Sequence, residues 1–153
     1  LLFFVPFVLV GLGLLGATVH QTLALSNPRP VFELASPALS PGAETDLSWH
    51  IEGNVYRLRS LTVHLIGRET AKYRRGTNTY TDHHEFETTA LFEGRNPEDF
   101  RRARATLRIP PDTMPSFDAP NNRIEWMLKV KGEIGWWPDV RVEYPLSVGY
   151  RKG

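Results

Sequence analysis

In the stretch TDLSWHIE, residues 45–52, polar and apolar side chains alternate from Asp46 to Glu52. Successive side chains of an extended strand point to opposite faces of a sheet. Leu47, Trp49 and Ile51 therefore share one face, while polar residues occupy the other. The alternation predicts a strand that packs one face on a core and leaves the other in water.

The same pattern continues on both sides of this stretch. Turn signals rich in Pro and Gly separate alternating runs at intervals of about ten residues, which is typical of a β-sandwich. We expect strands over 31–35, 45–52, 58–67, 69–75, 79–92, 100–109, 123–131 and 140–148. Gly67 is expected to end the third strand, and Pro145 places the last one at a sheet edge. Residues 110–122 are too rich in Pro for a regular element, and Asn96 is expected to cap one helical turn.

The predicted fold class is therefore all-β, an antiparallel β-sandwich over 31–149 with a short tail over 150–153. It has an arrestin- or immunoglobulin-like strand pattern and follows an apolar N-terminal segment.

That segment reads LLFFVPFVLVGLGLLGATV over residues 1–19, and the first charged residue is Arg29. At about 1.5 Å of rise per residue, a helix of this length spans roughly 28 Å, close to the thickness of a bilayer core. The sequence predicts a transmembrane helix over 1–22 and a Pro-containing linker over 23–30. A secretory signal peptide is the main alternative, although no charged leading region and no small-residue cleavage motif are visible.

Glycines in this helix formally match the dinucleotide-binding pattern, with Gly11, Gly13 and Gly16 at the required spacing. That pattern needs a strand before it and an acidic residue after it, and continuous apolar sequence supplies neither. In a membrane helix, small residues instead let a second helix approach closely. We predict a helix–helix contact through Gly13, Gly16 and Ala17, against the alternative that glycine is simply common in membrane helices.

Charge and cysteine content exclude several function classes. The chain has 18 Lys and Arg against 17 Asp and Glu, a net charge of +1 that does not favour nucleic-acid binding. It contains no Cys, so disulfides, a thiolate nucleophile, Cys-type zinc sites and iron–sulfur clusters are excluded.

Candidate catalytic chemistry is equally sparse. Asp82, His83, His84 and Glu85 form one run of possible metal ligands, but adjacent strand residues point to opposite faces and cannot readily grip one ion. No G-x-S-x-G motif accompanies any of the histidines. We therefore predict no catalytic, cofactor-binding or metal-binding residues, no cofactor, and a protein that is not an enzyme.

Trp136 and Trp137 are the most informative surface candidates. Two adjacent indoles in a loop are difficult to bury together, and exposed Trp is enriched at binding hot spots and membrane interfaces. We expect one or both to contact a partner or the lipid headgroups, with packing at the end of the core as the alternative. The loop over 114–117 is a second candidate. Two groups of basic residues are most simply explained as charged faces of the sheets. They could also bind lipid phosphates or an acidic partner. The groups are Arg101, Arg102 and Arg104, and Lys72, Arg74 and Arg75.

The closing segments carry a family resemblance. Ile109-Pro-Pro, Ser116-Phe, the run IEWMLKV over 124–130, Pro138-Asp-Val and YPLSV over 144–148 resemble the last strands of arrestin-like β-sandwich domains. With the preceding apolar helix, the chain resembles the C-terminal half of a family of uncharacterised bacterial membrane proteins. The resemblance implies a sandwich that serves as a scaffold or adaptor, and it transfers no catalytic residue. The Trp136-Trp137 pair is bulkier than the pattern requires.

These observations predict a non-enzymatic, membrane-anchored interaction module. It would be an accessory subunit that stabilises a large membrane assembly, such as a respiratory or photosynthetic complex, with membrane lipids and other membrane-protein subunits as partners. A membrane-tethered ligand-binding or sensor sandwich is the alternative, with its small-molecule ligand unknown. The expected location is the bacterial plasma membrane, with the domain on the cytoplasmic side and the periplasmic side as the other possibility.

Overall fold

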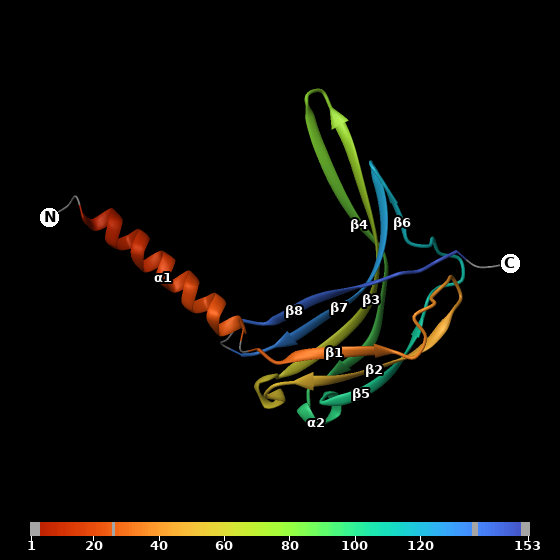
Figure 1. The fold of residues 1–153 in the computed structure, drawn as a ribbon, viewed down its shortest axis with the longest axis horizontal. Helices are drawn as coiled ribbons and strands as arrows, with labels where there is room; N and C mark the ends of the chain where they lie inside the picture. Colours follow the sequence, from red (N-terminus) through yellow and green to blue (C-terminus); the bar gives the residue numbers. More distant parts are fainter. Residues whose placement is uncertain (1–3, 26, 136–137, 151–153) are drawn as a thin grey trace.

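The computed structural model describes residues 4–25, 27–135 and 138–150, which form an apolar helix followed by two packed antiparallel sheets (Figure 1). The elements, in chain order, are helix α1 (Val5–Leu25), strands β1 (Arg29–Leu34) and β2 (Glu44–Glu52), the 3₁₀ turn η2 (Val55–Arg57), strands β3 (Ser60–Arg75) and β4 (Asn78–Gly94), helix α2 (Pro97–Phe100), and strands β5 (Arg102–Arg108), β6 (Phe117–Ala119), β7 (Asn122–Glu133) and β8 (Val140–Leu146).

The two sheets confirm the predicted antiparallel β-sandwich. One sheet has three strands in the order β1-β2-β5, and the other has the order β4-β3-β7-β6, with β8 also paired to β7. Because β3 runs along one edge of β7, β6 and β8 must share its other edge: β6 pairs with its first residues and β8 with the rest. As expected, β8 lies at a sheet edge, where Pro145 costs no ladder bond to a further strand.

The core lies between the sheets and matches the predicted strand faces. Leu47, Trp49 and Ile51 of β2 are buried, and so are the alternate apolar residues of β3 and β7 that face them. Trp49 packs between the sheets, with its ring centroid 5.6 Å from that of Phe32 and 5.1 Å from that of Phe92. Trp49 is 3% exposed, as its strand face predicts, and Trp126 of β7 is 1% exposed.

The connection between the helix and the sandwich is shorter than predicted. The helix α1 continues to Leu25 and β1 begins at Arg29, so only residues 26–28 lie between them instead of a linker over 23–30. Pro30, which falls inside the predicted linker, pairs with Ile51 in the sheet. It is tolerated because β1 is an edge strand, where a missing N–H on the outer side costs little.

The prediction that the third strand ends at Gly67 is wrong. Strand β3 runs through Gly67 to Arg75, and β4 bulges opposite this point, where the pairing register shifts between Gly67 and Arg68. A Cβ added to Gly67 would lie 2.6 Å from Cε2 of Phe86. This glycine therefore makes room for an aromatic ring that packs across the strand, and it does not mark a turn.

Two shorter elements have mixed outcomes. The helical turn α2 is confirmed, because Oδ1 of Asn96 accepts a hydrogen bond from the Glu98 N–H at 3.2 Å. The prediction of no regular element over 110–122 is wrong, because β6 forms within it. Its three residues pair with the first three of β7, with Phe117 opposite Ile124.

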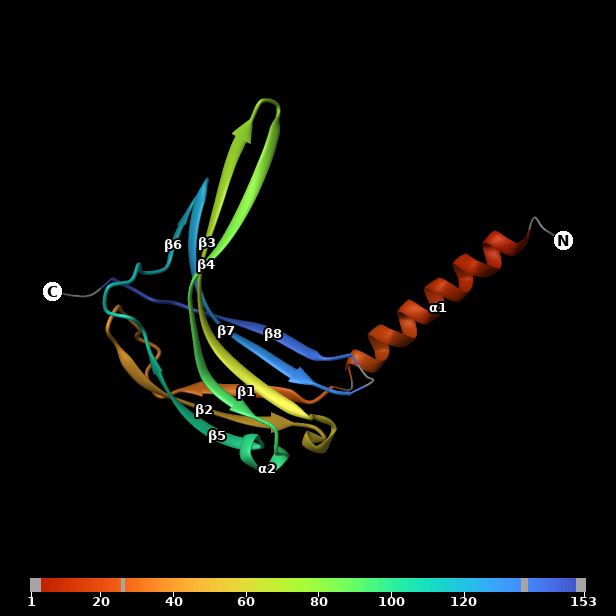
Figure 2. The ribbon, with the colours of Figure 1, turned by 180° about the vertical axis from the view of Figure 1, so that it is seen from behind.

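Strands β3 and β4 extend past Asn122, the first residue of β7, and continue there as a two-stranded hairpin. We call residues 72–81 the β3–β4 arm, because β7 pairs with β3 only as far as Ala71. Figures 1 and 2 show the arm rising clear of the sandwich, and α1 leaving the sandwich toward the same side. The arm and α1 therefore both extend beyond the sandwich.

Candidate functional site

The helix α1 is long and apolar enough to cross a membrane. It contains no charged residue, and every side chain from Phe4 to Thr22 is exposed. Its polar hydroxyls are satisfied within the helix: Oγ1 of Thr18 donates to the Leu14 carbonyl at 2.8 Å, and Oγ1 of Thr22 donates to the Thr18 carbonyl at 2.7 Å. The helix thus presents little that requires water.

The predicted helix–helix face lies open along α1. Nothing lies within 4 Å of a Cβ built on Gly13 or Gly16, and the Ala17 side chain is exposed. Gly13 and Ala17 are four residues apart and so lie on one side of the helix. A helix–helix contact through these residues stays a prediction.

Trp136 and Trp137 lie outside the described residues, and only the residues on either side of them can be located. Nδ2 of Asn27, two residues after the end of α1, donates to the Pro138 carbonyl at 2.9 Å. On the other side, Oδ1 of Asp139 accepts from the Ile134 N–H at 3.1 Å. The described flanks of the tryptophan pair therefore lie beside the junction of helix and sandwich.

The histidine run does not bring its two imidazoles together. Thr70 Oγ1 and His83 Nδ1 are 3.0 Å apart and share a hydrogen bond, whereas His84 pairs across the hairpin with Glu69. The two imidazoles are thus on opposite faces of β4. Among the residues that the structure describes, no group of three or more His, Cys, Asp or Glu side chains could hold a metal ion.

A charge network crosses four strands on the outer face of the larger sheet. Arg68 of β3 donates to Glu143 of β8 at 2.9 Å and to Glu85 of β4 at 3.1 Å, and Lys129 of β7 also donates to Glu85, at 3.2 Å. Hydrogen bonds from Arg68 lower the pKa of both Glu85 and Glu143. Two cations and two carboxylates neutralise one another here, so the network ties strands together and offers no unpaired charge to a substrate.

We expect Arg68→Met to lower the free energy of unfolding at neutral pH by about 1 kcal/mol, because solvent screening keeps each of these pairs weak. The two carboxylates have a lowered pKa in the folded state, so their stabilising effect is fully present above the ordinary value of 4.5 and is lost as the pH falls through the lowered values. Urea unfolding of the chain in mild detergent should show a smaller difference between variant and wild type at acid pH. Arg74→Met is the matched control and should leave stability unchanged. A difference that grows on acidification would contradict the assignment.

The two basic groups lie at opposite ends of the molecule. Arg101, Arg102 and Arg104 are exposed around α2 and β5, at the bottom of Figure 1. His50 and Glu33 border the same surface, which mixes both signs of charge. Lys72, Arg74 and Arg75 lie at the other end, on the β3–β4 arm. The structure therefore does not combine them into one basic patch.

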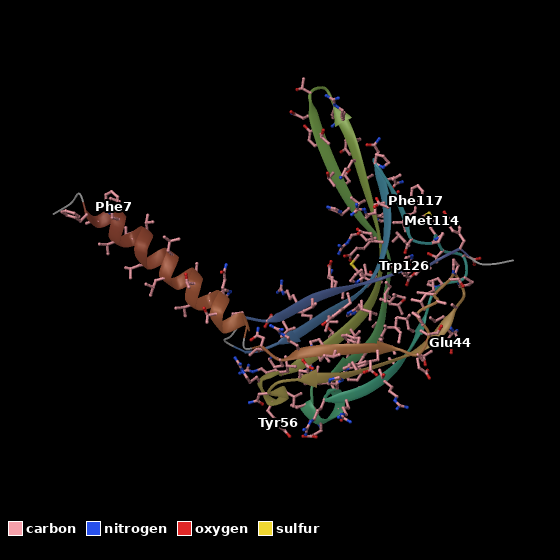
Figure 3. The ribbon with its side chains drawn as sticks, viewed as in Figure 1. Phe7, Glu44, Tyr56, Met114, Phe117 and Trp126 are labelled. Carbon is pink, nitrogen blue, oxygen red and sulfur yellow. The ribbon has the colours of Figure 1, made fainter. Side chains whose placement is uncertain are left out.

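A groove beside β6 was only partly anticipated. Trp126 donates from Nε1 to the Met114 carbonyl at 2.9 Å, which holds the loop before β6 against the core. Met114 and Phe117 remain 48% and 44% exposed on that loop, and Figure 3 shows both near Trp126. With Ile124 and Leu146, Phe117 and Trp126 line a groove of about 570 Å³. The sequence signalled the loop, but the groove depends on how β6 and β8 share the edge of β7.

Comparison with known proteins agrees with this architecture. No family model matches the chain, and no curated protein matches it in sequence. Among solved structures, the chain is similar to the sporulation control protein Spo0M from Bacillus subtilis, with a TM-score of 0.53 and 14% identity. The match covers 79% of this chain and 49% of that one, so it spans about half of the Spo0M chain. At this identity the likeness concerns the fold alone, and it supports an arrestin-like β-sandwich.

Proposed function

We propose that this chain is a non-enzymatic, membrane-anchored interaction module, an accessory subunit that stabilises a large membrane assembly such as a respiratory or photosynthetic complex. The observation that carries the proposal is α1, whose 21 residues bear no charge and whose window from Val5 to Thr22 is not buried by the sandwich. Exposure of so much apolar surface to water is costly, at about 25 cal/mol for each Å². A bilayer, or a bilayer with neighbouring helices, removes that cost.

Partner subunits give a reason for the open small-residue face of α1. Apolar side chains alone do not drive helix association in lipid, because lipid tails are equally apolar. Small residues do, since they permit close backbone packing. We therefore assign Gly13, Gly16 and Ala17 to contact with a helix of the partner assembly.

Trp136 and Trp137 are proposed to contact that assembly or the lipid headgroups. In their support, the neighbouring Pro138 lies beside Asn27, two residues beyond the end of α1. If α1 crosses the bilayer, this junction is at its surface, where Trp is enriched. The bacterial plasma membrane is the proposed location, with the sandwich on the cytoplasmic side.

The test is affinity isolation of the full chain from its native membrane in mild detergent. Membrane-protein subunits should co-purify in fixed proportion. The double change Trp136→Ser and Trp137→Ser should weaken that association by more than about 2 kcal/mol, the size of a binding hot spot. Tyr56→Ser with Tyr150→Ser, at two exposed aromatic positions, is the matched control. Recovery of the chain alone would refute the accessory-subunit proposal, and equal loss in both double variants would remove the two tryptophans from it.

The groove beside β6 favours one other candidate, a membrane-tethered ligand-binding or sensor sandwich. Its apolar lining of Phe117, Ile124, Trp126 and Leu146 could accept a small apolar group. That candidate gains support if the chain remains in the membrane but isolates without a partner. It then predicts that Phe117→Asp abolishes ligand binding without release from the membrane.

A further inference from the structure

Apart from one backbone hydrogen bond at its base, from the Lys72 N–H to the Asn121 carbonyl at 2.9 Å, the β3–β4 arm is exposed on both faces. Its four cross-strand pairs, from Lys72 opposite Thr81 to Arg75 opposite Asn78, join only β3 and β4. Every side chain from Lys72 to Glu85 is exposed. A two-stranded hairpin is marginally stable by itself in water. An arm of this kind is therefore suited to gain order from a surface that it meets.

Charge is concentrated on the arm. Residues 72–81 contain Lys72, Arg74 and Arg75 and no acidic residue, so they carry +3 in a chain whose net charge is +1, and the remainder carries −2. Among the described residues, none of the ion pairs found involves these three cations. Alternate residues face opposite sides, so Lys72 and Arg74 occupy one face and Arg75 the other. Because cations lie on both faces, the tip can enter end-on among anionic groups and meet negative charge on either side.

Two tyrosines stiffen the arm below its tip. The rings of Tyr73 and Tyr80 stack, with centroids 5.7 Å apart and planes 20° from parallel. The charge of Asp82, the residue that follows the arm, and a hydrogen bond to it raise the pKa of Tyr73. Tyrosine is enriched at the level of lipid headgroups.

We propose that the β3–β4 arm docks on the anionic lipid surface of the membrane that α1 crosses, with Lys72, Arg74 and Arg75 meeting lipid phosphates. The inference rests on the proposed membrane anchoring by α1. In its support, the arm rises above the sandwich and α1 slopes away from it toward the same upper side (Figures 1 and 2). Two attachments, one apolar and one electrostatic, would hold the sandwich at a fixed orientation on the bilayer.

The test uses the full chain reconstituted in lipid vesicles. Because the chain has no cysteine, Thr77→Cys at the tip gives a single site for an environment-sensitive fluorophore. Quenching by a nitroxide on the lipid headgroup is measured in phosphatidylcholine vesicles with and without phosphatidylserine, and flotation reports whether the chain is anchored. The triple change Lys72→Gln, Arg74→Gln and Arg75→Gln removes the charge. The matched control changes Arg101, Arg102 and Arg104 to Gln at the opposite end of the molecule.

We expect strong quenching only in the phosphatidylserine vesicles. Each cation at an anionic surface contributes about a fivefold gain, so the triple change should lower the contact equilibrium roughly a hundredfold and abolish the quenching. The control should be quenched like the wild type. Flotation without quenching, or equal quenching in neutral vesicles, overturns the arm inference and leaves the anchor intact. A wild-type chain that does not float overturns the proposed anchoring as well.

Discussion

Trp126→Ala is expected to lower the free energy of unfolding by about 3–5 kcal/mol, the range for large aromatic truncations in a core. The side chain is 1% exposed, and its ring meets that of Phe86 edge-on at a centroid distance of 5.6 Å with an interplanar angle of 85°. The truncation removes this packing and also the hydrogen bond to the Met114 carbonyl. Urea unfolding in mild detergent, followed by far-ultraviolet circular dichroism, measures the loss.

The control for this prediction is a comparison of two Trp→Phe changes. Trp126→Phe keeps an aromatic ring but leaves the Met114 carbonyl without its donor, whereas Nε1 of Trp49 is buried with no hydrogen-bond partner among the described residues. Trp49→Phe should therefore cost less than Trp126→Phe, because it removes an unsatisfied donor. A loss below about 1 kcal/mol for Trp126→Ala would show that the strand faces are misassigned.

Leu12→Arg together with Leu15→Arg is expected to abolish retention of the chain in the membrane. Both leucines lie near the middle of α1 and are more than 60% exposed, at 63% and 66%. Each Arg near the centre of a membrane helix costs about 2.5–3.5 kcal/mol on insertion scales, so the pair reverses the preference for the bilayer. Ultracentrifugal fractionation should move the variant from the membrane pellet to the supernatant.

The same two charges placed on the sandwich serve as the control. Thr88→Arg with Thr106→Arg adds two arginines at exposed strand positions and should leave the chain in the pellet. Retention of the helix variant in the pellet would mean that α1 is not what holds the chain there.

Local alternation predicted the sandwich core because each strand buries only one face. Leu47, Trp49 and Ile51 could be placed from sequence because a shift of one residue would expose all three. Gly67 was misread because glycine serves both at turns and where a ring crosses a strand. Which use applies depends on Phe86, in a different strand.

The candidate surfaces were harder to predict from the sequence, because they depend on where neighbouring strands begin and end relative to one another. Strands were expected over 69–75 and 79–92, but the sequence did not show that their connected ends leave the sandwich. That follows from β7 beginning at Asn122, opposite Ala71. The groove at Phe117 likewise depends on the register of β6 and β8 along one edge. By contrast, the apolar segment was recognisable because membrane length and the absence of charge are properties of composition alone.

Alkaline carbonate extraction of the full-length chain tests the central claim, that α1 anchors an arrestin-like sandwich in the membrane. High pH strips proteins that are held only by charge, including any held only by the β3–β4 arm, but it does not remove a helix that crosses the bilayer. The account predicts that the chain stays in the membrane pellet. Release of the full-length chain into the soluble fraction would contradict it.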